Sequence, residues 1–116
     1  MDYKFINTEY LDSVSGGDAD IIQELVTMFK SQSHEIHDEM IKLLAAKNYS
    51  MLGLLAHKAK SSVAIMGMSD LAEMLKTFEH QAKESEESEL YESYVSRFKT
   101  ETDSAAKELE DMIANL

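Results

Sequence analysis

The sequence predicts an all-α protein, built as an antiparallel up-down-up-down four-helix bundle with a short N-terminal capping helix. Three observations predict this fold class. The 116 residues contain no proline and only four glycines, so little interrupts a helix. Four segments carry apolar residues at three- and four-residue steps, which is the amphipathic helical pattern. The connections between these segments are short, as is typical of antiparallel neighbours in a bundle.

The short N-terminal helix is expected over roughly Glu9–Val14, with Thr8 as its N-cap and Gly16 as its stop. The first long helix is expected over roughly Ala19–Ala46, with Asp18 as its N-cap. The apolar positions of this long helix share one face, and they are Ile22, Leu25, Val26, Phe29, Ile36, Met40, Leu43 and Leu44.

The second long helix is expected over roughly Tyr49–Met66, capped by Asn48 and stopped by Gly67. At about 100° per residue, its core positions fall within roughly 60° of one direction. These positions are Leu52, Leu55, Ala56, Ala59, Val63 and Met66.

The third long helix is expected over roughly Asp70–Lys83, and the fourth from a cap at Ser88 to about Asn115. The polar run Lys83–Glu89 between them is predicted to be a solvated loop. The core positions of the third are Leu71, Leu75, Phe78 and Ala82, and those of the fourth are Tyr91, Tyr94, Val95, Phe98, Ala105, Leu109, Met112 and Ile113. Residues 1–116 are therefore expected to form a single domain.

The composition excludes several classes of function. A net charge of −11 argues against binding to nucleic acid or to an anionic membrane surface. The absence of cysteine removes disulfides, thiol nucleophiles and thiolate metal sites. The segment Met1–Lys4 lacks a basic stretch followed by an apolar one, so we expect no secretory signal and a cytoplasmic protein.

One segment departs from this acidic composition. The acid-free segment Met40–Ser69 contains no Asp or Glu, although 22 of the 116 residues are acidic. It carries four lysines and, near its middle, His57. On the second long helix His57 lies roughly 140° from the core direction, so the imidazole is expected to face solvent. The sequence therefore predicts a surface that tolerates an anion beside an exposed histidine.

The residues around His57 are small or apolar, which is unusual for a solvated helix face. Gly53, Leu54 and Ala64 share its face, and the glycine costs about 1 kcal/mol of helix propensity against alanine. Leu54, Ile65 and Met68 are apolar yet are expected to project away from the core, which indicates a partner-docking surface. The expected docking residues are Gly53, Leu54, Lys58, Ala64, Ile65 and Met68. Alternatively, Leu54, Ile65 and Met68 belong to the core, if the helix is rotated or packs against the N-terminal helix.

The chemistry of these side chains suits a phosphoryl group on His57. A substantial fraction of imidazole is unprotonated near neutral pH, so it can accept a phosphoryl group. Lys60, one turn further along, can place its ammonium beside the added charge, and Ser61 can donate a hydrogen bond. A carboxylate beside His57 would repel the group, and the sequence places none in this segment. The other reading of His57 is an ordinary exposed histidine.

These residues resemble the signature of histidine-containing phosphotransfer (HPt) domains. The resemblance rests on the stretch from His57 to Gly67, in which His57, Lys60, Ser62 and Gly67 match the pattern, and on Leu71, Leu75 and Glu79 beyond it. It extends over roughly Ile6–Asn115. Two residues depart from the pattern: Ala59 replaces a bulky apolar residue, and Ser61 replaces a glycine that leaves room for the partner.

The resemblance implies a phosphorelay carrier. Such a domain accepts a phosphoryl group from an aspartyl phosphate of a receiver domain onto Nε2 of its histidine, here His57, and passes it to another receiver. It implies response-regulator receiver domains and a hybrid sensor histidine kinase as partners, with Mg²⁺ on the receiver. It implies no cofactor, no ATP site and no kinase activity of the carrier's own, and a monomer. Met1, directly before the family-like region, favours a stand-alone protein.

Two other functions stay open. The protein could be an HPt-shaped module that binds receivers without accepting phosphate, or a plain helical bundle that dimerises through an apolar face. A metal site is not expected. His34 and His37 are three residues apart, but no histidine has a Glu three residues earlier, as di-iron bundles require. His80 is expected to be solvated.

Overall fold

The computed structural model describes residues 3–115 and confirms the all-α bundle. Within this range there is no β-strand, and no helix is long and apolar enough to cross a membrane. The expectations for Met1 and Asp2 concern residues outside the described range. The elements in chain order are α1 (Thr8–Ser15), α2 (Ala19–Ala45), α3 (Tyr49–Ile65), α4 (Ser69–Lys83), a short 3-10 helix (Ser88–Leu90) and α5 (Tyr91–Ala114).

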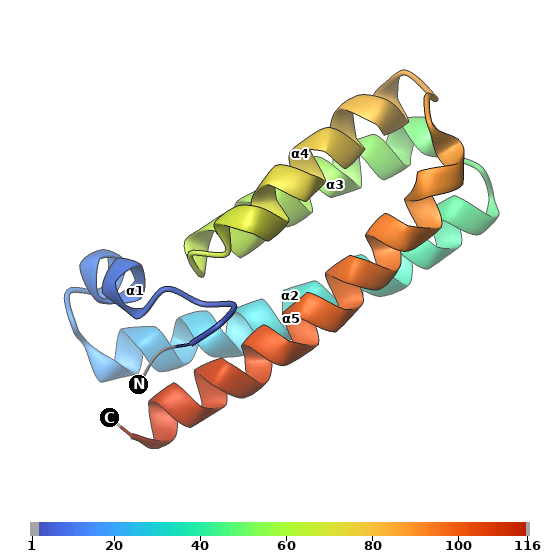
Figure 1. Ribbon diagram of the computed structural model, residues 1–116. Helices are drawn as coiled ribbons and strands as arrows, with labels where there is room; N and C mark the ends of the chain where they lie inside the picture. The colour runs from blue at the N-terminus through green and yellow to red at the C-terminus, as the bar shows by residue number, and fades with distance from the viewer. Residues whose placement is uncertain (1–2, 116) are drawn as a thin grey trace.

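The four long helices alternate in direction and form two pairs (Figure 1). α3 and α4 lie side by side as one pair, and α2 and α5 form the other. α1 lies at one end of the bundle, beside the start of α2, and the described part of the chain begins and ends at that same end. The bundle is elongated, with extents of 43 × 20 × 19 Å. The close α3–α4 pairing matters most for function, because it brings residues of α4 against the exposed histidine of α3.

Most of the core positions expected from periodicity are buried, and six of them are half-buried against the core: Leu25, Leu43, Leu44, Leu55, Tyr94 and Ile113. Every predicted core position of α4 is buried, and Phe78 and Tyr91 pack with a ring-centroid distance of 5.4 Å. The fully buried large side chains are Tyr91, Phe29, Phe78, Phe98, Leu11, Ile22, Met40, Leu52, Leu71, Leu75, Leu109 and Val63. Ser33 interrupts the stripe of α2, and it is buried with its hydroxyl donating to the carbonyl of Lys30 at 3.2 Å.

Two of the predicted N-caps, Thr8 and Ser88, are wrong. Asn7, not Thr8, caps α1: its Oδ1 accepts a hydrogen bond from the backbone N–H of Tyr10 at 3.0 Å, and Thr8 is already helical. Asparagine is a better N-cap than threonine, so the helix begins one residue earlier. The last helix begins with a 3-10 turn at Ser88–Leu90 before α5, and Ser88 makes no cap hydrogen bond. The predicted caps Asp18 and Asn48 are confirmed.

The N-terminal segment ties the two pairs of helices together. The carboxylate of Glu108 on α5 accepts hydrogen bonds from the backbone N–H groups of Lys4, Phe5 and Ile6 at 3.2, 2.9 and 3.3 Å. Asn7 then reaches the α3–α4 turn at Gly67. A Cβ at Gly67 would lie 2.6 Å from Asn7 Cβ, and φ there is 74°. Only glycine therefore fits this turn without strain.

Candidate functional site

His57 lies on the solvent side of α3. Its side chain is 57% exposed, whereas Ala56 and Ala59 beside it are fully buried. The orientation agrees with the 100° geometry of a helix, which turns position 57 away from the bundle core. An approaching molecule can therefore reach the imidazole.

A carboxylate nevertheless touches His57, and this corrects the expectation that none would. Oε1 of Glu79, on α4, lies 3.0 Å from Nδ1 of His57. The Glu79 side chain is only 7% exposed. The expectation failed because it considered sequence neighbours, and packing of α4 on α3 brings in a residue 22 positions further along the chain.

Two lysines neutralise Glu79. Lys83 donates to Oε2 at 2.7 Å, and Lys60 donates to Oε1 at 3.3 Å. The hydrogen bond from Lys83, with those from His57 and Lys60, outweighs desolvation by burial and lowers the pKa of the Glu79 carboxyl from 4.5 to about 2. The carboxylate is therefore ionised at neutral pH. Two cations against one anion leave the cluster with a net positive charge, which favours a nearby anion.

The contact with Glu79 sets the proton position on the imidazole. An ionised carboxylate can only accept hydrogen bonds, so Nδ1 of neutral His57 must carry the ring proton. The lone pair then resides on Nε2, which lies across the ring from Glu79. Fixing one ring nitrogen by a buried acceptor is how proteins select a histidine tautomer. The arrangement therefore presents a nucleophilic nitrogen to solvent, with Lys60 nearby.

A family model for the Hpt domain matches residues 24–116. The chain belongs to the Hpt domain family. Hpt domains are histidine phosphotransfer modules of phosphorelays; they are phosphocarriers rather than kinases, and they work with response-regulator receiver domains and kinases. The resemblance found from the residues around His57 is thereby confirmed. The comparisons with curated proteins and with solved structures gave no match.

Two of the predicted docking residues of this Hpt domain are not on its surface. Met68 is only 3% exposed, because the α3–α4 turn folds it inward toward the N-terminal segment. Gly53 is buried because α4 crosses directly over it, and a Cβ there would lie 3.3 Å from the carbonyl oxygen of Glu79. The two corrections have different causes: α4 covers Gly53, whereas Met68 lies in the turn after α3 and is folded inward there.

The other four predicted docking residues are accessible. Leu54 and Ile65 are large apolar side chains that stay exposed on α3, and Lys58 and Ala64 are exposed on the same helix. The alternative in which Leu54 and Ile65 belong to the core is therefore wrong, although it holds for Met68. The Hpt domain keeps apolar surface on the helix that carries its histidine, as a docking surface requires.

The residues where the chain departs from the HPt pattern lie on opposite sides of α3. Ala59 is fully buried in the core beneath the site. Ser61 is exposed one turn after His57, and its hydroxyl donates to the backbone carbonyl of His57 at 3.4 Å. A serine in this position adds little bulk, and its hydroxyl can turn from a weak backbone contact toward an incoming anion.

Sequence reasoning named Glu79 only as part of the family pattern and missed its contact with His57. Sequence reasoning also placed Lys83 at the start of a predicted solvated loop, whereas it is the last residue of α4. A signal for both was present. Glu79 lies four residues after Leu75 on the core-facing side of α4, where an acid must have a cationic partner, and Lys83 is four residues further on the same helix.

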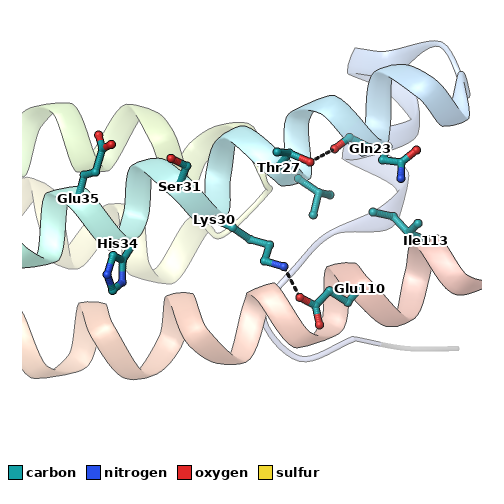
Figure 2. Close-up of a pocket in the computed structure, with 9 residues that line it drawn as sticks. Gln23, Thr27, Lys30, Ser31, His34, Glu35, Glu110 and Ile113 are labelled. Atoms are coloured by element: carbon teal, nitrogen blue, oxygen red, sulfur yellow. Dashed lines mark hydrogen bonds and ion pairs between the residues drawn. The ribbon is translucent and has the colours of Figure 1, made fainter.

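A hollow of about 680 Å³ lies away from this site, between α2 and α5 (Figure 2). Val26 and Ile113 line it, and an ion pair between Lys30 and Glu110 crosses it. None of its lining residues comes from α3 or α4. Since a phosphocarrier must offer its histidine to a partner protein, the open surface at His57 fits the family's chemistry better than this hollow.

Proposed function

We propose that this Hpt domain carries a phosphoryl group on Nε2 of His57. It accepts the group from the aspartyl phosphate of one receiver domain and passes it to another. The observation that supports this proposal is the exposed imidazole whose Nδ1 is held by the ionised carboxylate of Glu79, with Lys60 alongside. Family membership alone supports histidine phosphotransfer in general; the geometry favours His57 as the histidine that is used.

The transfer needs no proton movement on the carrier. The Nε2 lone pair attacks phosphorus, the N–P bond forms, and the bond to the aspartyl oxygen breaks to release a carboxylate. The ring keeps its Nδ1 proton and becomes positively charged, which the Glu79 carboxylate 3.0 Å away stabilises. Lys60 and Ser61, three and four residues after His57 on α3, would stabilise the negative charge on the phosphoryl oxygens. The receiver supplies Mg²⁺, so the carrier's part is positioning and charge stabilisation.

The partners we propose are response-regulator receiver domains and a hybrid sensor histidine kinase. They would dock over Leu54 and Ile65, with Lys58 and Ala64 beside them, because these residues are exposed on the helix that presents His57. We further propose that the protein acts in the cytoplasm as a single-domain monomer, without an ATP site or kinase activity of its own.

Incubation with a phosphorylated receiver and Mg²⁺ tests the function. Wild-type protein is expected to acquire an acid-labile, base-stable phosphoryl group, and His57→Gln is expected to acquire none. His80→Gln is the matched control, because His80 is an exposed histidine on α4 and should leave labelling unchanged. Label that persists in His57→Gln would show that another residue carries the group. A wild-type protein that binds receivers but never becomes labelled would instead be a receiver-binding module.

Lys60→Ala is expected to slow transfer about tenfold and to shorten the phosphohistidine lifetime. A hydrogen bond to a charged group is worth about 1.5–3 kcal/mol, and the lower figure applies because Lys60 is only partly buried. About 1.4 kcal/mol corresponds to a tenfold change in rate. Lys58→Ala, which removes an exposed lysine nearby, should have a smaller effect on the lifetime. An unchanged rate and lifetime in Lys60→Ala would remove Lys60 from the mechanism.

A further inference from the structure

Gly53 marks a very close approach of α4 to α3 below the active histidine. A Cβ built at Gly53 would lie 3.0 Å from Cγ of Lys83, 3.3 Å from the carbonyl oxygen of Glu79 and 3.3 Å from the backbone nitrogen of Lys83. Glycine in the middle of a helix is unfavourable, and such glycines usually have a packing or functional reason. Here the missing side chain makes room for the aliphatic part of Lys83.

Lys83 uses this room to reach Glu79. Its side chain passes over Gly53, and its ammonium lies 2.7 Å from Oε2 of Glu79, which makes this the shortest of the carboxylate's contacts. The carboxylate is thereby divided between two sets of partners. Oε2 is occupied by Lys83, and Oε1 faces His57 at 3.0 Å and Lys60 at 3.3 Å.

This division bears on what Lys60 can do. If Lys83 were absent, Lys60 would be the one lysine within hydrogen-bond reach of the carboxylate, as far as the described residues show. An ionised carboxylate buried without enough compensation attracts the nearest cation strongly. Lys60 would then be held at Glu79 and would be less available to a phosphoryl group on His57.

We propose that Lys83, which lies over Gly53, is a positioning residue for phosphoryl transfer. It compensates the negative charge of Glu79, so that Glu79 can hold the His57 ring while Lys60 stays available to the phosphoryl group. The inference rests on the proposed use of His57. Lys83 does not touch the reacting atoms; it acts through Glu79 and Lys60. Gly53, expected from sequence to contact the partner, acts instead beneath the site by admitting the Lys83 stem.

The test uses phosphoramidate, a small phosphoryl donor, so that receiver docking plays no part. Nε2 of His57 attacks phosphorus, and the donor's P–N bond breaks to release ammonia. Lys83→Met keeps most of the stem and removes the charge; it is expected to slow labelling of His57 by about five- to tenfold and to shorten the lifetime of the phosphohistidine. Lys83→Arg keeps the charge and should restore a rate within about twofold of wild type.

Lys76→Met is the matched control, because Lys76 is an exposed lysine two turns earlier on α4 and should leave both readouts unchanged. Urea unfolding of each variant separates loss of fold from loss of reactivity. A Lys83→Met protein that folds and labels at the wild-type rate overturns the inference, and so does a failure of Lys83→Arg to restore the rate. Wild-type protein that accepts label from phosphoramidate but not from any receiver overturns the relay function alone. Wild-type protein without label from either donor overturns both.

A double-mutant cycle tests the part played by Gly53. Gly53→Ala displaces the Lys83 stem and should slow labelling by phosphoramidate in the wild-type background. In the Lys83→Met background it should add less than about a twofold effect, because the interaction it disturbs is already lost. An equal slowing in both backgrounds would show that Gly53 acts through helix spacing rather than through Lys83.

Discussion

Protonation of Glu79 is expected to remove about 3 kcal/mol of folding stability between pH 5 and pH 2. The folded-state pKa is about 2, below the ordinary value of 4.5, so the folded protein binds fewer protons than the unfolded chain in this window. The stabilisation is therefore fully present above pH 4.5 and is lost as the pH falls through 2. A shift of one pKa unit corresponds to about 1.4 kcal/mol, which gives the expected size.

The measurement is urea unfolding of wild type and Glu79→Gln at several pH values from 5 to 2. Glutamine keeps the shape of the side chain and does not titrate, so the difference in unfolding free energy isolates Glu79 from the other 21 acidic residues. The unfolding free energy of wild type minus that of Glu79→Gln should fall by about 3 kcal/mol as the pH is lowered from 5 to 2. A difference that stays constant with pH would mean that Glu79 is not held ionised by Lys83, Lys60 and His57.

Under the proposed function, the same cluster would let a protein with a net charge of −11 hold a phosphoryl group on His57. The acid-free segment of sequence is only part of the explanation. The carboxylate that does approach His57 is matched by Lys60 and Lys83, and it faces Nδ1 rather than Nε2. In the proposed transfer, a negative charge on that side of the ring would stabilise the positive charge that forms on the imidazole, while the lysines would favour the negative charge of the phosphoryl group.

Periodicity predicted the fold because each long helix buries one stripe, and a stripe is a local property of the sequence. The orientation of His57 followed from the same geometry. Residues governed by contacts between helices were not predictable in this way. Gly53 and Met68 look like surface residues from α3 alone, and they are buried by α4 and by the α3–α4 turn.

Glu79 is a second residue whose contacts could not be predicted from periodicity. Of the three partners that keep it ionised, only Lys83 is local, four residues further along α4. Two of those partners come from α3, about twenty residues earlier. Only the pairing of α3 with α4 joins the histidine, the carboxylate and the lysines into one site.

Phe78→Ala is expected to destabilise the protein by about 3–5 kcal/mol, which is the usual cost of deleting a buried phenylalanine. Phe78 is fully buried, and its ring lies 5.4 Å from that of Tyr91 and 5.1 Å from that of Tyr94, centroid to centroid. Removing it leaves a cavity between α4 and α5 and forfeits both aromatic contacts. Urea unfolding followed by the helical circular dichroism signal gives the difference in unfolding free energy.

Thr77→Ala is the control for this prediction, because Thr77 is exposed on the neighbouring position of α4 and its change should lie within about 0.5 kcal/mol of wild type.

Phe78 directly precedes Glu79, so the aromatic cluster fixes the part of α4 that presents the carboxylate to His57. Phe78→Leu keeps much of the apolar volume and should cost less than Phe78→Ala while retaining the acid-dependent contribution of Glu79. A loss below about 1 kcal/mol in Phe78→Ala would mean that α4 is held against α3 without this cluster, and that the Glu79–His57 contact depends on the α3–α4 pairing alone.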